Sequence, residues 1–168
     1  MVHREVNMKI GIIGVYYASN LGDAVICDCV YYWLKQKYPK AMIDVIDIEG
    51  KQDFPKQTSV SLFTLKRRKW KLQWDYLLTR YGIKDIVYKW NQLDVAQRQS
   101  FYEKIAQKKY DAVVFAGGQL FMDWLSVDIC EFLKRFERMG TSVYFNACGM
   151  GISVSKKIRI LLSEHLAS

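Results

Sequence analysis

The stretch from Lys9 to Asp23 constrains the fold of this 168-residue chain more than any other. Residues 10–15 form a short apolar run rich in β-branched side chains, which is typical of a buried parallel strand. A polar turn with Asn20 and Gly22 follows, directly before a segment with helical periodicity. A strand, a glycine-containing loop and a helix N-terminus present backbone N–H groups and partial positive charge to a ligand. Because open α/β sheets bind ligands at the carboxyl ends of their strands, the sequence predicts a site here.

Strand and helix signals alternate along the rest of the chain. Ser126 is a plausible N-cap of one helix and Gly140 a plausible residue just past its end. The first helix carries an apolar stripe that includes Trp33, which we expect to face the core. Expected strands lie at 10–15, 43–48, 110–116 and 142–146, and expected helices at 23–38, 126–139 and 155–167. This alternation predicts a single doubly wound α/β domain with a mostly parallel, Rossmann-like sheet.

Glycine-rich turns are expected at three strand ends, which a parallel sheet brings to one edge. Two adjacent glycines are more than a turn requires and suggest close approach of the backbone to a ligand. The alternative is that these residues only cap helices and form turns. Neither a Walker A motif nor G-x-G-x-x-G occurs, so an ATPase or dinucleotide enzyme is not supported. The candidate catalytic or substrate-orienting carboxylate is Asp23, and the candidate substrate-binding residues are Asn20, Gly22, Gly117, Gly118, Gln119, Asp123, Gly149 and Gly151.

The net charge of +8 comes from one middle segment. Residues 51–109 contain 14 Lys and Arg residues against 5 Asp and Glu residues, and we interpret this segment as a basic helical insertion in the domain. Within it, residues 66–81 combine an apolar stripe of Trp70, Trp74 and Leu77 with a basic start. The first interpretation is an amphipathic helix packed on the domain, the second is a helix on a membrane surface. Nucleic-acid binding comes third and is not expected, since no recognised motif supports it.

The cysteine and histidine pattern argues against a metal site. No C-x-x-C pair occurs, and His3 and His165 both lie near the termini, so we predict no metal and no Ser/His/Asp or Cys/His nucleophilic set. No apolar run approaches the roughly 20 residues of a membrane span, and the N-terminus lacks signal-peptide features, which predicts a cytoplasmic protein. We expect reduced, mostly buried thiols at Cys27, Cys29, Cys130 and Cys148.

Three blocks of this sequence resemble the amino-terminal half of polysaccharide pyruvyl transferases. The blocks are residues 9–24, 110–123 and 146–151, and their order and spacing agree with that family. Asn20-Leu21-Gly22-Asp23 is the most specific, and Gly117-Gly118 supports it. The third block departs from the family pattern, because Ile152 follows Gly151 where the family commonly has a proline. Residues 51–109 show no match.

The resemblance implies a two-domain enzyme with a glycosyltransferase-B-like architecture. Such enzymes transfer pyruvate from phosphoenolpyruvate, as a ketal, to a sugar of a cell-surface polysaccharide or its lipid-linked precursor, with no cofactor beyond this donor. The donor-binding residues lie mainly in the carboxy-terminal half. We therefore expect residues 1–168 to be an isolated amino-terminal domain, inactive alone, that supplies the acceptor-side wall of the cleft through Asn20, Asp23, Gln119 and Asp123.

The resemblance also suggests a role for residues 66–81, which would hold the enzyme at the inner face of the membrane beside a lipid-linked acceptor. Two other functions remain open from the sequence. One is a glycosyltransferase that uses a nucleotide sugar, and the other is a non-catalytic domain that binds a glycan or a partner. The acceptor sugar and the oligomeric state are left open.

Overall fold

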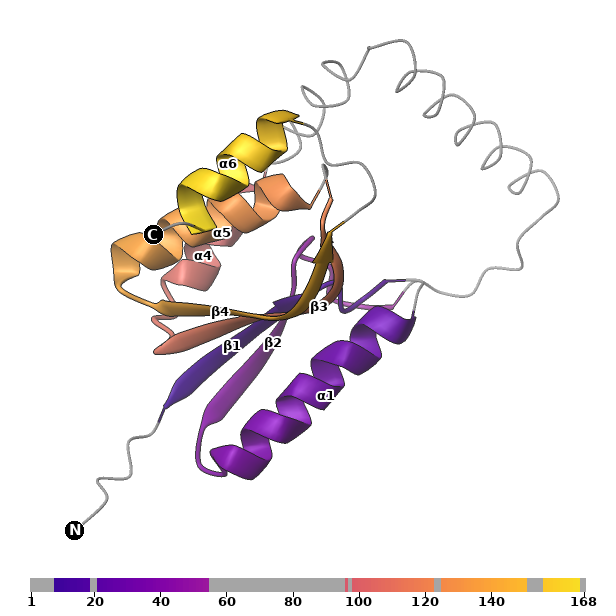
Figure 1. Cartoon of the computed structure of the whole chain (residues 1–168). Helices are drawn as coiled ribbons and strands as arrows, with labels where there is room; N and C mark the ends of the chain where they lie inside the picture. Colours follow the sequence, from indigo (N-terminus) through magenta and orange to yellow (C-terminus); the bar gives the residue numbers. More distant parts are fainter. Residues whose placement is uncertain are drawn as a thin grey trace, which may run out of the picture.

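A parallel sheet forms the centre of the protein in the computed structural model (Figure 1), which describes residues 8–18, 21–54, 96, 98–122, 125–150 and 156–166. All neighbouring strands pair in parallel, in the order β2-β1-β3-β4. This arrangement confirms the predicted doubly wound α/β class. The strands are β1 (Lys9–Gly14), β2 (Met42–Asp47), β3 (Ala112–Phe121) and β4 (Ser142–Met150).

Helices cover both faces of the sheet. In Figure 1, α1 lies on one face, and α4, α5 and α6 lie on the other. Gly140 ends α5 with a φ of 66°, as predicted, but Ser126 is the first helical residue and Leu125 occupies the cap position without a side-chain hydrogen bond. The bounds are α1 (Leu21–Lys37), α4 (Gln99–Ala106), α5 (Ser126–Met139) and α6 (Lys156–Leu166).

Alternate residues of β1 supply the two cores. Ile13 belongs to the large cluster beneath α4 and α5, whereas Ile12 joins Cys27 of α1 and Ala116 in a smaller cluster on the opposite face. Both isoleucines are fully buried. The period-2 pattern of a strand therefore explains why an unbroken apolar run is required in the centre of the sheet.

The helix α1 faces the sheet with Val30 and Leu34, which pack against the smaller cluster, but not with Trp33. Its buried residues are Ala24 and Cys27, and Trp33 is 76% exposed, so the predicted inward position of Trp33 is wrong. The closest contact with β1 lies at Gly14, where a Cβ atom would stand 2.6 Å from the Cys27 Sγ. Because α1 packs this closely on β1, the small side chains of Ala24 and Cys27 are its buried residues.

Strands β3 and β4 run further than the sequence predicts. Gly117 and Gly118 were expected in a turn, and Gly149 in another, but all three lie within the strands. Gly118 pairs with Cys148, and a shift of register follows before Phe121. The positive φ of Gly117 (36°) and Gly118 (72°) explains this irregularity, since glycine adopts such angles without steric cost.

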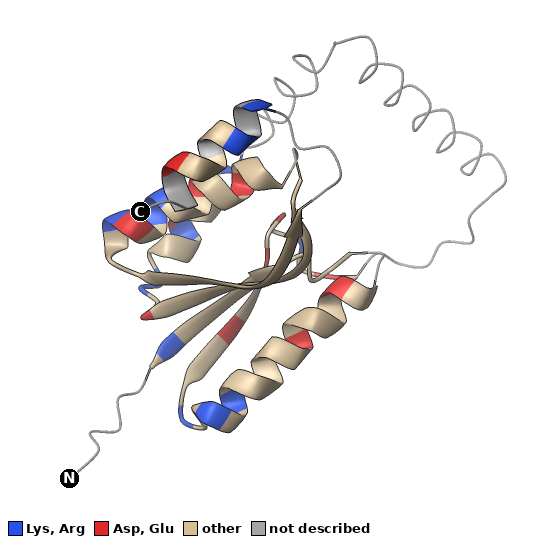
Figure 2. Ribbon diagram, in the orientation of Figure 1, with Lys and Arg blue, Asp and Glu red and all other residues tan. Residues whose placement is uncertain are grey.

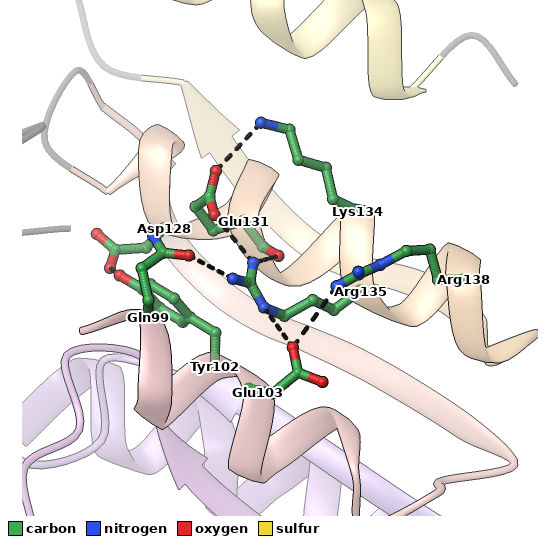
Figure 3. A network of polar contacts seen from close by, with 8 residues as sticks. All are labelled: Gln99, Tyr102, Glu103, Asp128, Glu131, Lys134, Arg135 and Arg138. Carbon is green, nitrogen blue, oxygen red and sulfur yellow. Dashed lines mark hydrogen bonds and ion pairs between the residues drawn. The ribbon is translucent and has the colours of Figure 1, made fainter. Parts of the chain in front are cut away.

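An ion-pair network joins α4 to α5 (Figure 3). Asp128 is 1% exposed, accepts a hydrogen bond from the Tyr102 hydroxyl and forms an ion pair with Arg98 at 2.7 Å. Arg135 of α5 bridges the same two helices through Gln99 and Glu103 of α4, and it also pairs with Glu131 of its own helix at 2.9 Å. The network fixes α4, which lies near the carboxyl end of the basic middle segment, to the body of the domain.

Candidate functional site

The centre of the sheet contains a topological switch point. Strands β1 and β3 are neighbours, yet α1, which follows β1, covers one face, while α5, which follows β3, covers the other (Figure 1). The connections diverge at the carboxyl ends of these strands and leave a crevice there, which is where open α/β folds bind ligands.

A cavity of about 280 Å³ lies at this switch point. It combines residues that follow β1, the first turn of α1 and the end of β3. Asp23, Gly118 and Gln119, three of the sequence-predicted site residues, are brought together in its wall. The lining residues are Val15, Asp23, Gly118, Gln119, Leu120, Met122 and Leu125.

The Asp23 carboxylate stands against the backbone of Gly118. A Cβ atom on Gly118 would lie 2.5 Å from the Asp23 Oδ1, so any side chain there would displace the carboxylate. Asp23 also lies in the first turn of α1, where the helix dipole favours a negative charge. Figure 2 shows the corresponding polarity of α1, with acidic residues toward its N-terminal end and basic residues at its C-terminal end.

The neighbouring glycines have packing reasons for their positions. A Cβ atom on Gly117 would lie 2.1 Å from the Ile26 Cγ2, and one on Gly149 would lie 3.3 Å from the Gly118 carbonyl oxygen. Gly22 is the second residue of α1 and is exposed. Gly117 and Gly149 therefore allow α1, β3 and β4 to approach one another, and the substrate-binding role of all three glycines stays a prediction.

Asp47, which the sequence reasoning missed, anchors the backbone beside the cavity. It ends β2, is 3% exposed, and accepts hydrogen bonds from the backbone N–H groups of Tyr17 at 2.8 Å, Glu49 at 3.0 Å and Lys51 at 3.2 Å. It therefore fixes both the loop after β1 and the loop after β2. The signal was an acidic residue between the apolar Ile46 and Ile48 at a strand end.

The cysteine thiols near the cavity are poor nucleophiles. Burial raises the pKa of Cys27 to about 12, and the nearby Asp28, Asp23 and Asp47 carboxylates add to the shift. Burial also raises the pKa of Cys148. Cys27 and Cys130 are buried, Cys148 is half-buried, and Cys29 is exposed, with all four free, so the thiols are reduced but only two are fully buried. Protonated thiols leave carboxylates, amides and backbone groups for the chemistry of this edge.

Several sequence-based predictions lie outside the described residues. These are the site residues Asn20, Asp123 and Gly151, together with the proposed helix at 66–81. Across the part of the chain that the structure describes, no three His, Cys, Asp or Glu residues are grouped as metal ligands. In the same part, no helix combines the length and apolar character that a membrane crossing needs.

The family model described as "Polysaccharide pyruvyl transferase" matches residues 20–168. The chain belongs to the polysaccharide pyruvyl transferase family. The match includes Asp23, the two glycines of β3 and Gln119, which are the elements that surround the cavity. By its description this is a family of transferases that act on polysaccharides. Comparison with the curated proteins and with the solved structures found no match.

Proposed function

We propose that this protein transfers pyruvate from phosphoenolpyruvate, as a ketal, onto a sugar of a cell-surface polysaccharide or its lipid-linked precursor. The cavity at the switch point would form part of the acceptor side. Family membership supports the reaction class. The observation that carries the assignment to this site is the Asp23 carboxylate, which lines the cavity beside Gly118 and Gln119.

The reaction requires proton transfer at the acceptor. Two sugar hydroxyl oxygens bond to the enol carbon of the donor, and the bond from that carbon to the phosphate oxygen breaks with its electron pair on the phosphate. One hydroxyl proton ends on the methylene carbon, which becomes a methyl group, and the other ends on the released phosphate. A carboxylate within hydrogen-bond reach of an attacking hydroxyl can accept its proton. Asp23 is our candidate for this role.

The remaining polar groups of the wall would orient the acceptor. The Gln119 amide offers both a donor and an acceptor to hydroxyl groups. Asn20 and Asp123 are proposed to act beside it. Apolar lining by Val15, Leu120 and Met122 matches the usual composition of small-molecule sites, in which few polar groups fix orientation.

The test is phosphate release from phosphoenolpyruvate by the native protein, with polysaccharide from the same cells as acceptor. We expect Asp23→Asn to lower kcat about 10²- to 10⁴-fold, while the lost charge at the helix N-terminus costs only about 0.3 to 1 kcal/mol in urea unfolding. Asp53→Asn, which removes an exposed carboxylate in the loop after β2, is the matched control. Unchanged kinetics would show that Asp23 has no catalytic role and acts only as a negative charge at the N-terminus of α1. Consumption of a nucleotide sugar in place of phosphoenolpyruvate would favour a glycosyltransferase.

A lipid-linked acceptor and a cytoplasmic location at the inner membrane face form a second part of this proposal. Their support is the combination of Trp70 and Trp74 with the surrounding Lys and Arg residues in the sequence. We expect binding to anionic vesicles at low salt, weakened by Trp70→Ala with Trp74→Ala. Equal binding to neutral and anionic vesicles, or none, would refute membrane contact through residues 66–81.

A further inference from the structure

Three aromatic rings cluster at the carboxyl ends of β1 and β2. Tyr16 and Tyr17 meet edge to face with centroids 4.9 Å apart. Phe54 meets Tyr17 at 5.1 Å and Tyr16 at 5.8 Å. After these contacts Phe54 is still 44% exposed. An exposed phenylalanine held against two tyrosines is a feature that core packing does not explain.

The cluster is rigidly supported. The buried Asp47 carboxylate binds the backbone N–H of Tyr17 and that of Lys51, three residues before Phe54. The same group therefore fixes both chain segments that bring the rings together. The Tyr16 hydroxyl also donates to Asp28 of α1 at 3.0 Å. The two tyrosines are thus held before any ligand binds, and such preorganisation favours binding.

The cluster and the candidate site lie at the same edge of the sheet. Val15 lines the cavity, and Tyr16 and Tyr17 follow it directly in the chain. The cavity lies at the ends of β1 and β3, whereas the rings lie at the ends of β1 and β2, so the two features share one strand. Neighbouring strands are about 4.8 Å apart, so the ends of β2, β1 and β3 that carry the two features follow one another along this edge.

We propose that Tyr16, Tyr17 and Phe54 form a platform that binds a pyranose ring of the acceptor glycan. Each pyranose presents C–H groups on its ring faces, and these carry partial positive charge, whereas the face of an aromatic ring is negative. Such a contact recognises the sugar ring and leaves the hydroxyls for the polar groups of the cavity. The acceptor identity rests on the proposed function, but the recognition of a pyranose does not require phosphoenolpyruvate.

Saturation-transfer NMR on the chain tests the platform with defined probes. The probes are methyl β-glucopyranoside, methyl β-galactopyranoside and methyl α-mannopyranoside, with sorbitol as an open-chain polyol. We expect at least one pyranoside to receive saturation, mostly on its ring C–H protons, and sorbitol to receive none. The absence of transfer to all three pyranosides, or equal transfer to sorbitol, overturns the platform.

Substitutions at Phe54 distinguish the contribution of an aromatic ring face to pyranoside binding from the contribution of apolar side-chain volume. Phe54→Leu should weaken pyranoside binding about two- to tenfold, and Phe54→Tyr should retain it. Tyr32→Leu, at a 62% exposed tyrosine of α1, is the matched control and should change nothing. Equal binding by Phe54→Leu and the unchanged chain would refute the proposal. Pyranoside binding without any phosphoenolpyruvate turnover would keep the platform and refute only the transferase function.

Discussion

Two buried carboxylates of this domain are stabilised in different ways. Asp128 lies between α4 and α5, where it meets the Tyr102 hydroxyl and the Arg98 guanidinium. Asp47 lies at the carboxyl end of β2, where its hydrogen bonds come from three backbone N–H groups. The first arrangement joins two helices through side chains. The second determines the path of two loops at the edge that holds the candidate site.

The difference separates the part of the molecule that maintains the fold from the part that presents a site. Asp128 has side-chain partners, Tyr102 and Arg98, within the helical layer, and Figure 3 shows it beside Tyr102. Around Asp47 the backbone is fixed, and the nearby side chains of Tyr16, Tyr17 and Phe54 stay partly accessible. Removing either carboxylate should therefore have different consequences for stability and for ligand binding.

The largest expected effect is the loss of Asp128. Asp128→Ala leaves Arg98 and Tyr102 without their shared acceptor, and breaking a buried pair by removing one partner costs about 3 to 5 kcal/mol. Urea unfolding at neutral pH measures this loss. Lys134→Ala removes an exposed partner of Glu131 on the same helix and should cost about 0 to 1 kcal/mol. Equal effects of the two variants would show that burial of Asp128 contributes little.

Replacing Asp47 tests the other half of the comparison. One Asp47 oxygen accepts from Tyr17, and the other accepts from Glu49 and Lys51. In Asp47→Asn, one of these positions becomes an NH₂ group that cannot accept, so we expect a loss of about 1.5 to 3 kcal/mol. Amide hydrogen exchange at Tyr17 and Lys51 should also accelerate. Asp53→Asn is the control, and unchanged exchange in Asp47→Asn would refute the anchoring role.

A pair of glycine substitutions isolates the contact between Gly118 and Asp23. Gly118 and Gly140 have similar φ angles of 72° and 66°, but a Cβ on Gly140 would have no atom within 4 Å. Gly140→Ala should cost about 1 to 2 kcal/mol from the left-handed backbone alone. Gly118→Ala should cost about 1 to 3 kcal/mol more, since its methyl group overpacks against the Asp23 carboxylate. Equal losses in urea unfolding would remove the evidence for a tight contact at the cavity.

Local signals account for the parts of the fold that the sequence predicted. The apolar run of β1 and the Gly140 that ends α5 are short-range patterns, and both formed as predicted, whereas Ser126 is the first residue of α5 and not its cap. The extension of β3 and β4 through their glycines depends on pairing between strands far apart in the chain, such as Gly118 with Cys148. Glycine pairs are usually interpreted as turns, so the sequence alone favoured the wrong local structure.

The candidate site was predictable to the extent that its residues have recognisable motifs. Asp23, Gly118 and Gln119 meet at one cavity because parallel strands bring their carboxyl ends to one edge. Asp47 was not predicted, since an acidic residue in a strand that alternates apolar and acidic side chains suggests a solvent-facing position. Its burial is possible because loop N–H groups converge on it, and that convergence is a tertiary property.

The smallest effect on stability is expected at Asp44, a partly exposed carboxylate that accepts hydrogen bonds from side chains. Burial would raise its pKa, but hydrogen bonds from Tyr110 and Lys108 and the charge of Lys9 outweigh burial, and the pKa lies below the usual 3.8. A carboxyl group whose pKa is lowered by folding stabilises the protein above its unfolded-state value. This contribution is lost as the pH falls through the folded-state value. We therefore expect its loss below about pH 4.

Urea midpoints between pH 7 and pH 3 measure this contribution. Asp44→Asn should lower stability at pH 7 and reduce the fall in stability below about pH 4. Glu131, whose pKa is lowered from 4.5 by Arg135 and Lys134 against the opposing effect of burial, should still contribute its own acid-induced loss. Acid sensitivity unchanged in Asp44→Asn would contradict the assignment. In that case the side-chain donors around Asp44 do not stabilise its charged form. Asp44 would then differ from the Asp128 network in what its partners contribute as well as in its burial.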